Sequence, residues 1–224
     1  AIHEVIDSTA FIKGKPVIEF QKELAAYLGV NYCIACGNGT DALQVALMSL
    51  ELNPGDEVIT SPFTFIATIE VISLLRLKPV LVDVDPNTFN IDPSKIEAAI
   101  TKKTRAILPV HLFGQAAQMD SILEIANKHN LYIIEDNAQA LGANYTFQDG
   151  SKKKTGTIGT IGCTSFFPSK NLGCFGDGGA IFTNNQSIAE KTGAMVNHGM
   201  IQKYQYDHIG VNSRLDTLQA AILR

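Results

Sequence analysis

The sequence predicts an α/β fold with a mostly parallel, seven-stranded sheet covered by helices. Two observations carry this prediction. Segments with apolar residues at helical spacing alternate along the 224-residue chain with short apolar segments rich in valine and isoleucine. The short segments are apolar at consecutive positions, which is typical of strands buried on both faces of a parallel sheet. No linker or internal repeat interrupts the pattern, so we expect one three-layer domain over residues 1–224.

The expected elements follow one another along the chain. Residues 1–15 predict a helix fragment and a loop, and helical spacing of Val17, Phe20, Leu24 and Tyr27 predicts a helix that ends at Gly29. The expected strands are 32–36, 57–60, 80–84, 104–112, 131–135, 163–167 and 179–183. Further helices are expected from 42, from about 66 to 77, from 92, over 119–129, over 187–196 and from about 215 to the end.

The composition argues against several classes of partner. The chain is 46% hydrophobic with a net charge of −4, and it has no basic stripe for nucleic acid. The lysine run 152–154 is expected at a solvated hairpin tip. No apolar run reaches membrane-spanning length, and the N-terminus lacks a signal-peptide pattern. The cysteine pair at 33 and 36 resembles half of a metal or redox motif, but its apolar strand favours core thiols. We therefore expect no metal, no disulfide scaffold and a cytoplasmic protein.

The segment 164–179, T-S-F-F-P-S-K-N-L-G-C-F-G-D-G-G, contains a single lysine, Lys170. Its aromatic, proline and glycine residues cannot continue a helix and would hold the ammonium group partly out of water. Desolvation disfavours the charged form, so Lys170 could act as a nucleophile toward carbonyl groups. The hydroxyl of Ser165 could donate to a phosphate. The alternative is an ordinary surface lysine in a glycine-rich loop.

Two other polar features follow expected strands. The turn at Gly39 and Thr40 joins a strand to a helix, where free N–H groups and the positive helix end can bind an anion. Its spacing matches neither common phosphate-loop motif, and Thr40 or Asp41 could simply cap the helix. Asp136 directly follows the strand 131–135, although an aspartate there could also be a helix cap.

Ligands of open α/β sheets bind at the carboxyl ends of strands, where these three features are expected to meet. A lysine, a buried carboxylate and a phosphate cradle are the protein groups that pyridoxal 5′-phosphate requires. The lysine attaches the cofactor, the carboxylate keeps the pyridine nitrogen protonated and the cradle holds the phosphate. Phe63 or Phe65 could cover the ring, or Phe65 could belong to the core. The sequence therefore predicts a pyridoxal-phosphate site.

Five motifs carry a resemblance to a known family: G-N-G-T-D-A-L (37–43), P-F-T-F-I-A-T (62–68), E-D-N-A-Q-A (135–140), the lysine segment (164–180) and G-V-N-S-R-L-D-T-L-Q-A-A-I-L (210–223). From near residue 10 onward the chain resembles the DegT/DnrJ/EryC1/StrS family of pyridoxal-phosphate-dependent sugar aminotransferases. The resemblance implies the large domain of the aspartate aminotransferase fold (fold type I). The family's small C-terminal domain is expected to be absent from this chain.

The resemblance also implies roles for individual residues. Lys170 would be the Schiff-base lysine and the proton carrier, and its presence favours transamination over the dehydration that relatives with histidine catalyse. Asp136 would pair with the pyridine nitrogen. The remaining implied cofactor contacts are Gln139 with the ring hydroxyl, Phe65 stacked on the ring, and Gly39, Thr40 and Ser165 with the phosphate. Asn212 would reach the phosphate in a neighbouring subunit, which implies a homodimer with shared active sites.

The sequences of the last two motifs resemble those of the subgroup that aminates C3 of UDP-linked 2-acetamido-hexuluronic acids. The implied substrates are a nucleotide-linked ketosugar and an amino-acid donor, with glutamate expected. Arg214 would face the uronate carboxylate, or else serve the subunit interface. Asn137 departs from the family pattern, because many relatives have a small residue there. A rival hypothesis is a non-catalytic, doubly wound binding or regulatory module in which Lys170 is structural.

Overall fold

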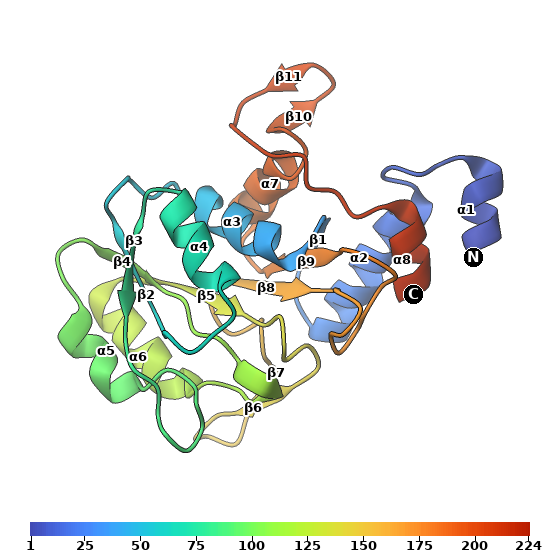
Figure 1. Cartoon of the computed structure of the whole chain (residues 1–224). Coiled ribbons are helices and arrows are strands. Elements are labelled where there is room, and N and C mark those ends of the chain that lie inside the picture. Colours follow the sequence, from blue (N-terminus) through green and yellow to red (C-terminus); the bar gives the residue numbers. More distant parts are fainter.

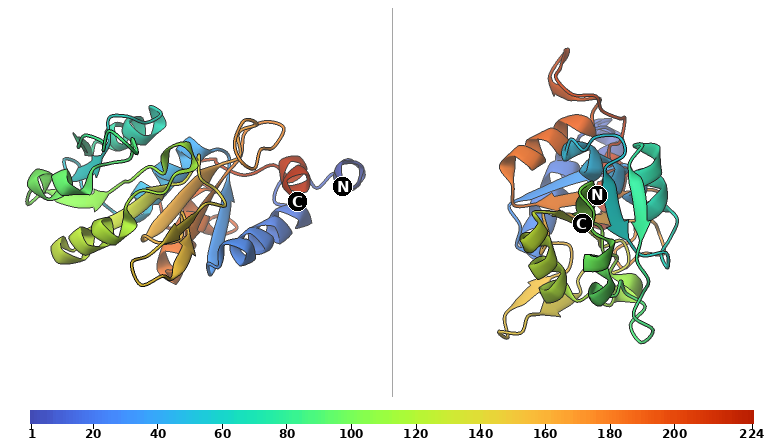
Figure 2. Two further views of the ribbon diagram at one scale, coloured as in Figure 1. Left: turned by 90° about the horizontal axis from the view of Figure 1, so that it is seen from below. Right: turned by 90° about the vertical axis from the view of Figure 1, so that its left-hand side faces the viewer.

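A seven-stranded sheet runs through the molecule with helices on both faces (Figure 1, Figure 2). The computed structural model describes residues 1–224. The strands of the sheet are β1 (Tyr32–Cys36), β2 (Glu57–Thr60), β3 (Lys78–Leu81), β4 (Thr104–Ile107), β5 (Tyr132–Asp136), β8 (Ile161–Ser165) and β9 (Gly179–Thr183). Their order is β1-β9-β8-β5-β4-β2-β3, and β9 alone pairs antiparallel with its neighbours. The prediction of a mostly parallel α/β sheet is confirmed.

Consecutive strand residues point to opposite faces, so each strand contributes to two hydrophobic layers. The helices are α1 (Ile2–Ser8), α2 (Lys15–Leu28), α3 (Gly39–Ser49), α4 (Ala67–Leu74), α5 (Pro93–Ala99), the 3₁₀ turn η1 (Leu112–Gly114), α6 (Met119–His129), α7 (Gln186–Met195) and α8 (Thr217–Leu223). Val58 and Ile134 pack with α3, α4 and α7. Ile59 and Ile133 pack on the other face with α5 and α6. Helices α2 and α8 cover that second face beside β1 and β9.

The strand boundaries differ from the prediction where the chain leaves the sheet. The strand β4 ends at Ile107 instead of continuing to 112, because Pro109 has no N–H for the ladder. The strands β3 and β8 each begin two residues earlier than expected, and α8 begins at Thr217 rather than 215. Tyr27 was predicted on the apolar face of α2 but is exposed, with the ammonium group of Lys154 4.2 Å from its ring centre.

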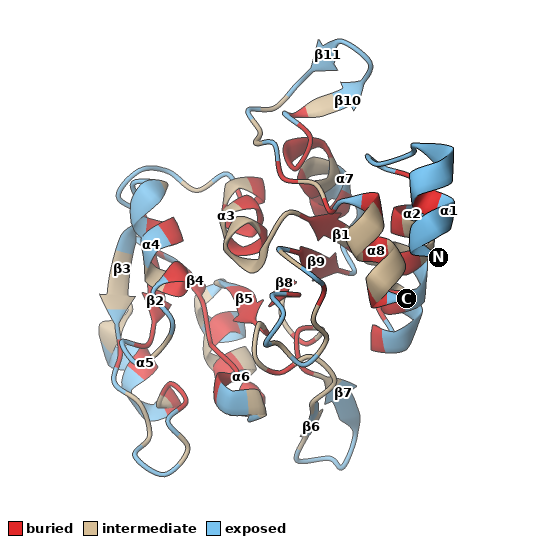
Figure 3. Ribbon diagram, turned by 45° about the vertical axis from the view of Figure 1, so that its right-hand side comes forward, coloured by how far each residue is buried: buried red, intermediate tan, exposed pale blue.

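Two hairpins project from the sheet body. The first pairs β6 (Asn144–Thr146) with β7 (Lys152–Lys154), so the lysine run forms a strand and not the predicted tip. The second pairs β10 (Met200–Gln202) with β11 (Gln205–Tyr206) and extends away from the other elements (Figure 1). The sheet strands are largely buried, whereas this second hairpin and α1 are mostly exposed (Figure 3). None of the helices is both long and apolar enough to cross a membrane.

Candidate active site

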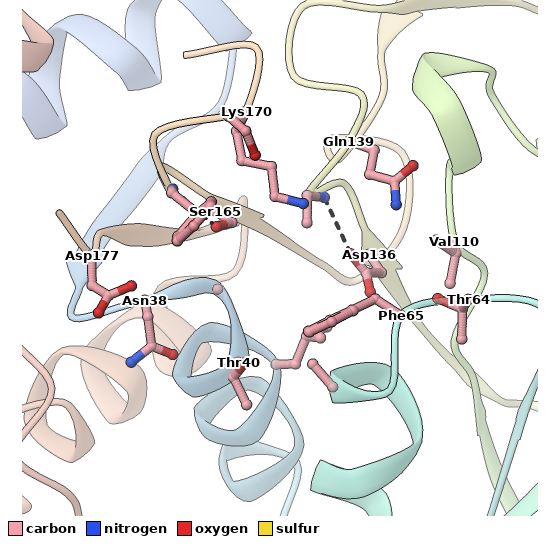
Figure 4. Close-up of a pocket in the computed structure, with 16 residues that line it drawn as sticks. Asn38, Thr40, Thr64, Phe65, Val110, Asp136, Gln139, Ser165, Lys170 and Asp177 are labelled. Atoms are coloured by element: carbon pink, nitrogen blue, oxygen red, sulfur yellow. Dashed lines mark hydrogen bonds between the residues drawn. The ribbon is translucent and has the colours of Figure 1, made fainter. Parts of the chain in front are cut away.

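A cavity of about 480 Å³ lies at the carboxyl ends of β5 and β8, beside the start of α3 (Figure 4). Seven of the predicted site residues line it: Gly39, Thr40, Phe65, Asp136, Gln139, Ser165 and Lys170. These residues come from segments that are far apart in the sequence, and the parallel topology brings their strand ends to one edge. The predicted convergence of the lysine, the carboxylate and the helix-start turn is present.

A cradle for an anion forms where β8 ends against the start of α3. The helix cap is Asn38, rather than Thr40 or Asp41, because its Oδ1 accepts a hydrogen bond from the Asp41 N–H at 2.8 Å. The N–H groups of Gly39 and Thr40 therefore remain without an intrahelical acceptor at the positive end of the helix. A Cβ on Gly39 would lie 2.6 Å from the Cβ of Ser165, so only glycine allows this approach. The site suits a phosphate group.

Asp136 ends β5 at the base of the cavity and is only 5% exposed. Its Oδ2 accepts a hydrogen bond from the Thr68 hydroxyl at 2.8 Å, and its Oδ1 accepts one from the Ala138 N–H at 3.1 Å. Burial raises the pKa of Asp136, whereas these two hydrogen bonds and the charge of nearby Lys170 act in the opposite direction. Because a hydroxyl and an amide are its direct partners, the carboxylate suits a ligand that brings a positive charge.

Lys170 lies on the loop between β8 and β9, and its side chain extends toward Asp136 (Figure 4). Its backbone N–H donates to the carbonyl of Phe167 at 2.8 Å, which forms a tight turn. A Cβ on Gly173 would lie 2.5 Å from the Pro168 carbonyl oxygen, so the two arms of the loop touch. Lys170 is partly exposed within the cavity, so the loop holds its side chain only partly out of water.

Gln139 and Phe65 are oriented by their neighbours. The Oε1 of Gln139 accepts a hydrogen bond from the Phe113 N–H at 2.8 Å, which leaves its NH₂ group free to donate to a ligand oxygen. Phe65 is 67% exposed and lines the cavity, so it does not belong to the core. Phe63 packs instead against the rings of Phe89 and Phe113, with centroids 5.6 and 6.4 Å away. Phe65 is therefore the aromatic residue that can cover a planar ligand.

Asn212 and Arg214 do not line the cavity of their own chain. Asn212 is exposed and pairs through its backbone with Asn197, at the base of the β10–β11 hairpin. Asn212 does not cap α8, because Asp216 occupies the cap position of that helix. The Nη1 of Arg214 donates to the Asn197 Oδ1 at 3.2 Å. Neither position tests the predicted roles, which require a second subunit or a substrate.

The sequence reasoning missed Thr64 and Thr68. Thr68 is fully buried and donates to Asp136, and its hydroxyl lies 3.0 Å from that of Thr64, which lines the cavity. Both threonines belong to the motif P-F-T-F-I-A-T: Thr64 lies in the turn before α4, and Thr68 lies in the first turn of that helix. Two hydroxyl side chains four residues apart in an otherwise apolar motif were the available signal.

The residues of the cavity, in the positions that they occupy, fit the groups of pyridoxal phosphate. The glycine-dependent cradle can hold the phosphate, Asp136 can face a protonated ring nitrogen, and Lys170 can reach the carbonyl carbon between them. Lys170 would be the group that moves a proton at the reacting carbon, and Asp136 would hold the proton on the ring nitrogen. No group of three or more histidine, cysteine, aspartate or glutamate side chains lies close enough together to hold a metal ion.

Comparisons with known proteins agree with this chemistry. The profile of the DegT/DnrJ/EryC1/StrS aminotransferase family matches residues 1–224. The UDP-2-acetamido-2-deoxy-3-oxo-D-glucuronate aminotransferase of Pseudomonas aeruginosa is 51% identical over 222 residues, which are 99% of this chain and 60% of that protein. The UDP-N-acetyl-3-dehydro-alpha-D-glucosamine 3-aminotransferase of Acidithiobacillus ferrooxidans is 47% identical, over 100% of this chain and 59% of that protein. The chain thus spans about 60% of the length of these relatives.

Solved structures show the same fold with a related cofactor. The crystal structure of NtdA from Bacillus subtilis, with bound cofactor PMP, superposes with a TM-score of 0.91 at 40% identity. The match covers 99% of this chain and 50% of that one. The shared fold and motifs confirm the resemblance and the fold type I assignment of the large domain. The chain belongs to the DegT/DnrJ/EryC1/StrS aminotransferase family.

Proposed function

We propose that residues 1–224 are the cofactor-binding large domain of a pyridoxal-phosphate-dependent aminotransferase that acts on a nucleotide-linked ketosugar. The observation that carries the proposal is the convergence of Lys170, Asp136 and the Gly39–Thr40 helix start on one cavity. Bound pyridoxal phosphate would supply an electron sink that stabilises negative charge at the substrate carbon. The protein's part is to hold the cofactor and to move protons.

Each residue has a task that follows from its surroundings. Lys170 holds the cofactor covalently before the reaction and carries a proton to and from the substrate carbon afterwards. Asp136 keeps the ring nitrogen protonated, which requires the carboxylate to stay ionised despite its burial. Gln139 donates its free NH₂ group to the ring hydroxyl, and Phe65 covers the ring face. The N–H groups of α3 and the Ser165 hydroxyl hold the phosphate.

The substrate is proposed to be a UDP-linked 2-acetamido-3-ketohexuluronic acid, with glutamate as amino donor. The UDP-2-acetamido-2-deoxy-3-oxo-D-glucuronate aminotransferase of Pseudomonas aeruginosa supports this choice through its 51% identity with this chain. Arg214 supports it through its position, because its only hydrogen bond goes to the neutral Asn197 side chain. A guanidinium without a carboxylate partner can bind the uronate carboxylate in a bidentate manner. Such a product would serve the biosynthesis of cell-surface polysaccharide or related amino sugars.

A homodimer is proposed to complete the site. The β10–β11 hairpin and the residues around it expose Ile201, Tyr204, Tyr206 and Ile209. Apolar and aromatic side chains on a projecting arm favour contact with another chain. Asn212 lies at the base of this arm and outside its own cavity, which supports a contact with the cofactor phosphate of the partner subunit. The cytoplasm is the proposed compartment, because all four cysteines are free and buried.

The test of the proposed function is covalent cofactor attachment followed by substrate turnover. The purified protein should be yellow, and borohydride should fix the cofactor on the peptide that contains Lys170. Lys170→Ala should abolish turnover but retain non-covalently bound cofactor, since the cradle and Asp136 remain. Turnover is then compared for the 3-keto uronate and for the equivalent neutral 3-keto sugar. A colourless protein that takes up no pyridoxal phosphate would support the rival non-catalytic binding module.

A further inference from the structure

The side chain of Gln219 in α8 contacts the outer arm of the Lys170 loop, at Phe175 and Gly176. Its Oε1 accepts a hydrogen bond from the Phe175 N–H at 2.8 Å, and its Nε2 donates to the Phe175 carbonyl at 3.2 Å. The side-chain amide thus bonds to both backbone polar groups of one residue, in the way that paired residues of antiparallel strands bond to each other. Gln219 therefore fixes both the position and the orientation of the Phe175 backbone.

Phe175 itself makes no hydrogen bond other than the two with Gln219. Its side chain is 77% exposed, so packing of the ring does not hold this part of the loop. Gly176 follows, and a Cβ there would lie 3.1 Å from the Gln219 Nε2, so the amide rests directly against the main chain. At Phe175, therefore, Gln219 is the side chain that holds the main chain of this arm.

Displacement of Phe175 would be transmitted to the lysine through short contacts. Cys174, the preceding residue, donates from its N–H to the Phe166 carbonyl at 2.8 Å, and its thiol donates to the Gly176 carbonyl at 3.2 Å. The Phe166 N–H in turn donates to the carbonyl of Gly178 at 2.7 Å. These bonds close the base of the loop, and the segment that carries Lys170 extends from this base. Movement of the arm shifts the base and with it the lysine.

Helix α8 is a firm support for this contact. Its residues Ala220 and Leu223, together with Leu215 just before the helix, share one hydrophobic cluster with α2 and with the buried side of the lysine loop. The Gly14 N–H donates to the Thr217 hydroxyl at 3.0 Å. At the other end Arg224 bonds to carboxylates of α2. Both ends of α8 are thus anchored, so the Gln219 side chain extends from a helix that is held at each end.

We propose that Gln219 is a positioning residue that holds the Lys170 loop in the geometry required for cofactor attachment and proton transfer. Gln219 does not line the cavity and acts only through Phe175. The inference rests on the proposed function, because it assigns Gln219 a role through the proposed role of Lys170. It links the last helix of the chain to the reacting lysine.

The test compares three variants. Gln219→Leu removes both hydrogen bonds at similar size, and Gln219→Glu keeps the acceptor but loses the donor. The matched control is Gln186→Leu, because Gln186 is an exposed glutamine at the start of α7 that bonds only to Glu190. The measurements are hydrogen exchange of the Phe175 amide, the rate at which cofactor-free protein attaches added pyridoxal phosphate to Lys170, and kcat and KM. Borohydride fixation and peptide mapping locate the attachment.

In Gln219→Leu the Phe175 amide should exchange roughly tenfold faster, as expected for two lost hydrogen bonds. The cofactor should attach to Lys170 roughly tenfold more slowly. The kcat of this variant should fall while KM for the amino donor stays near the parental value, and Gln219→Glu should be intermediate. Parental attachment and kcat in both Gln219 variants, or equal losses in Gln186→Leu, would overturn the inference. If Gln219→Leu fails to fold, Gln219→Glu decides. A parental protein that attaches no cofactor would instead overturn the proposed function.

Discussion

Replacement of Thr68 by valine tests how the fold keeps a buried carboxylate ionised. Thr68 is fully buried, and its hydroxyl donates to the Asp136 Oδ2 at 2.8 Å. Valine has nearly the same shape, so Thr68→Val removes the donor with little change in packing. The burial that raises the pKa of Asp136 then loses one of the hydrogen bonds that oppose it. The pKa of Asp136 should rise further in the variant.

The magnitude follows from the type of hydrogen bond. A hydrogen bond to a charged group contributes about 1.5–3 kcal/mol net. Since about 1.4 kcal/mol corresponds to a factor of ten, the ionised Asp136 should become roughly ten- to a hundredfold harder to maintain. The ionised form is the one that pairs with the protonated ring nitrogen, so cofactor affinity and kcat should both fall. The loss should be largest at low pH and shrink as pH rises, because higher pH restores the ionised carboxylate.

The assay measures the dissociation constant of the cofactor and kcat over the pH range in which the protein stays folded. Thr68→Ser keeps the hydroxyl and should remain close to the parental protein. Thr64→Val is the matched control, because the Thr64 hydroxyl contacts that of Thr68 and not the carboxylate. If Thr68→Val binds cofactor and turns over like the parent at every pH, or if Thr68→Ser is equally impaired, the reasoning is refuted.

Three further predictions concern neighbouring groups. Asp136→Asn should lose on the order of 10²–10⁴ in rate. The same variant should unfold at a higher temperature than the parent when cofactor-free at neutral pH, since a raised folded-state pKa costs stability above that pKa. Calorimetry should show this gain vanishing as the pH falls below the unfolded-state value of about 3.9. Mixing inactive Lys170→Ala with inactive Asn212→Asp should restore part of the activity in heterodimers, and an active monomer in sedimentation would contradict the shared site. Asn137 is fully buried, and its side chain has no hydrogen-bond partner in the protein. Asn137→Ala should therefore raise the unfolding temperature measured by calorimetry, because it removes an unpaired polar group that costs about 1–3 kcal/mol.

Features that depend on neighbouring residues could be predicted from the sequence. The apolar segments around Ile59 and Ile134 are buried on successive residues, and this local signal was sufficient for the sheet. Lys170 and Asp136 were found because strand ends meet at one edge of a parallel sheet, a rule that needs only the order of the elements. Boundaries were less accurate where a local event such as Pro109 ends a strand.

Features that depend on distant contacts could not be predicted. The contact between Thr68 and Asp136 spans 68 positions, and that between Gln219 and Phe175 spans 44. No sequence pattern near either residue of these pairs predicts which distant residue it contacts. The antiparallel direction of β9 was equally hidden, because an apolar strand looks the same in either direction. The helix cap was assigned to the wrong residue because Asn38, Thr40 and Asp41 can all cap a helix.

Two adjacent carboxylates at the end of β5 show how the environment separates structure from function. Glu135 is fully buried and accepts hydrogen bonds from backbone N–H groups of the segment 156–159 at 2.6–2.8 Å, and its Oε2 lies 2.9 Å from the His111 ring. Both carboxylate oxygens of Glu135 are thus hydrogen-bonded to other groups of the protein. Asp136 points to the opposite face with only a hydroxyl and one amide as partners, and burial raises its pKa. A fold selected for stability alone would not leave a carboxylate in that state, so the incompletely satisfied member of the pair is the one available to a ligand.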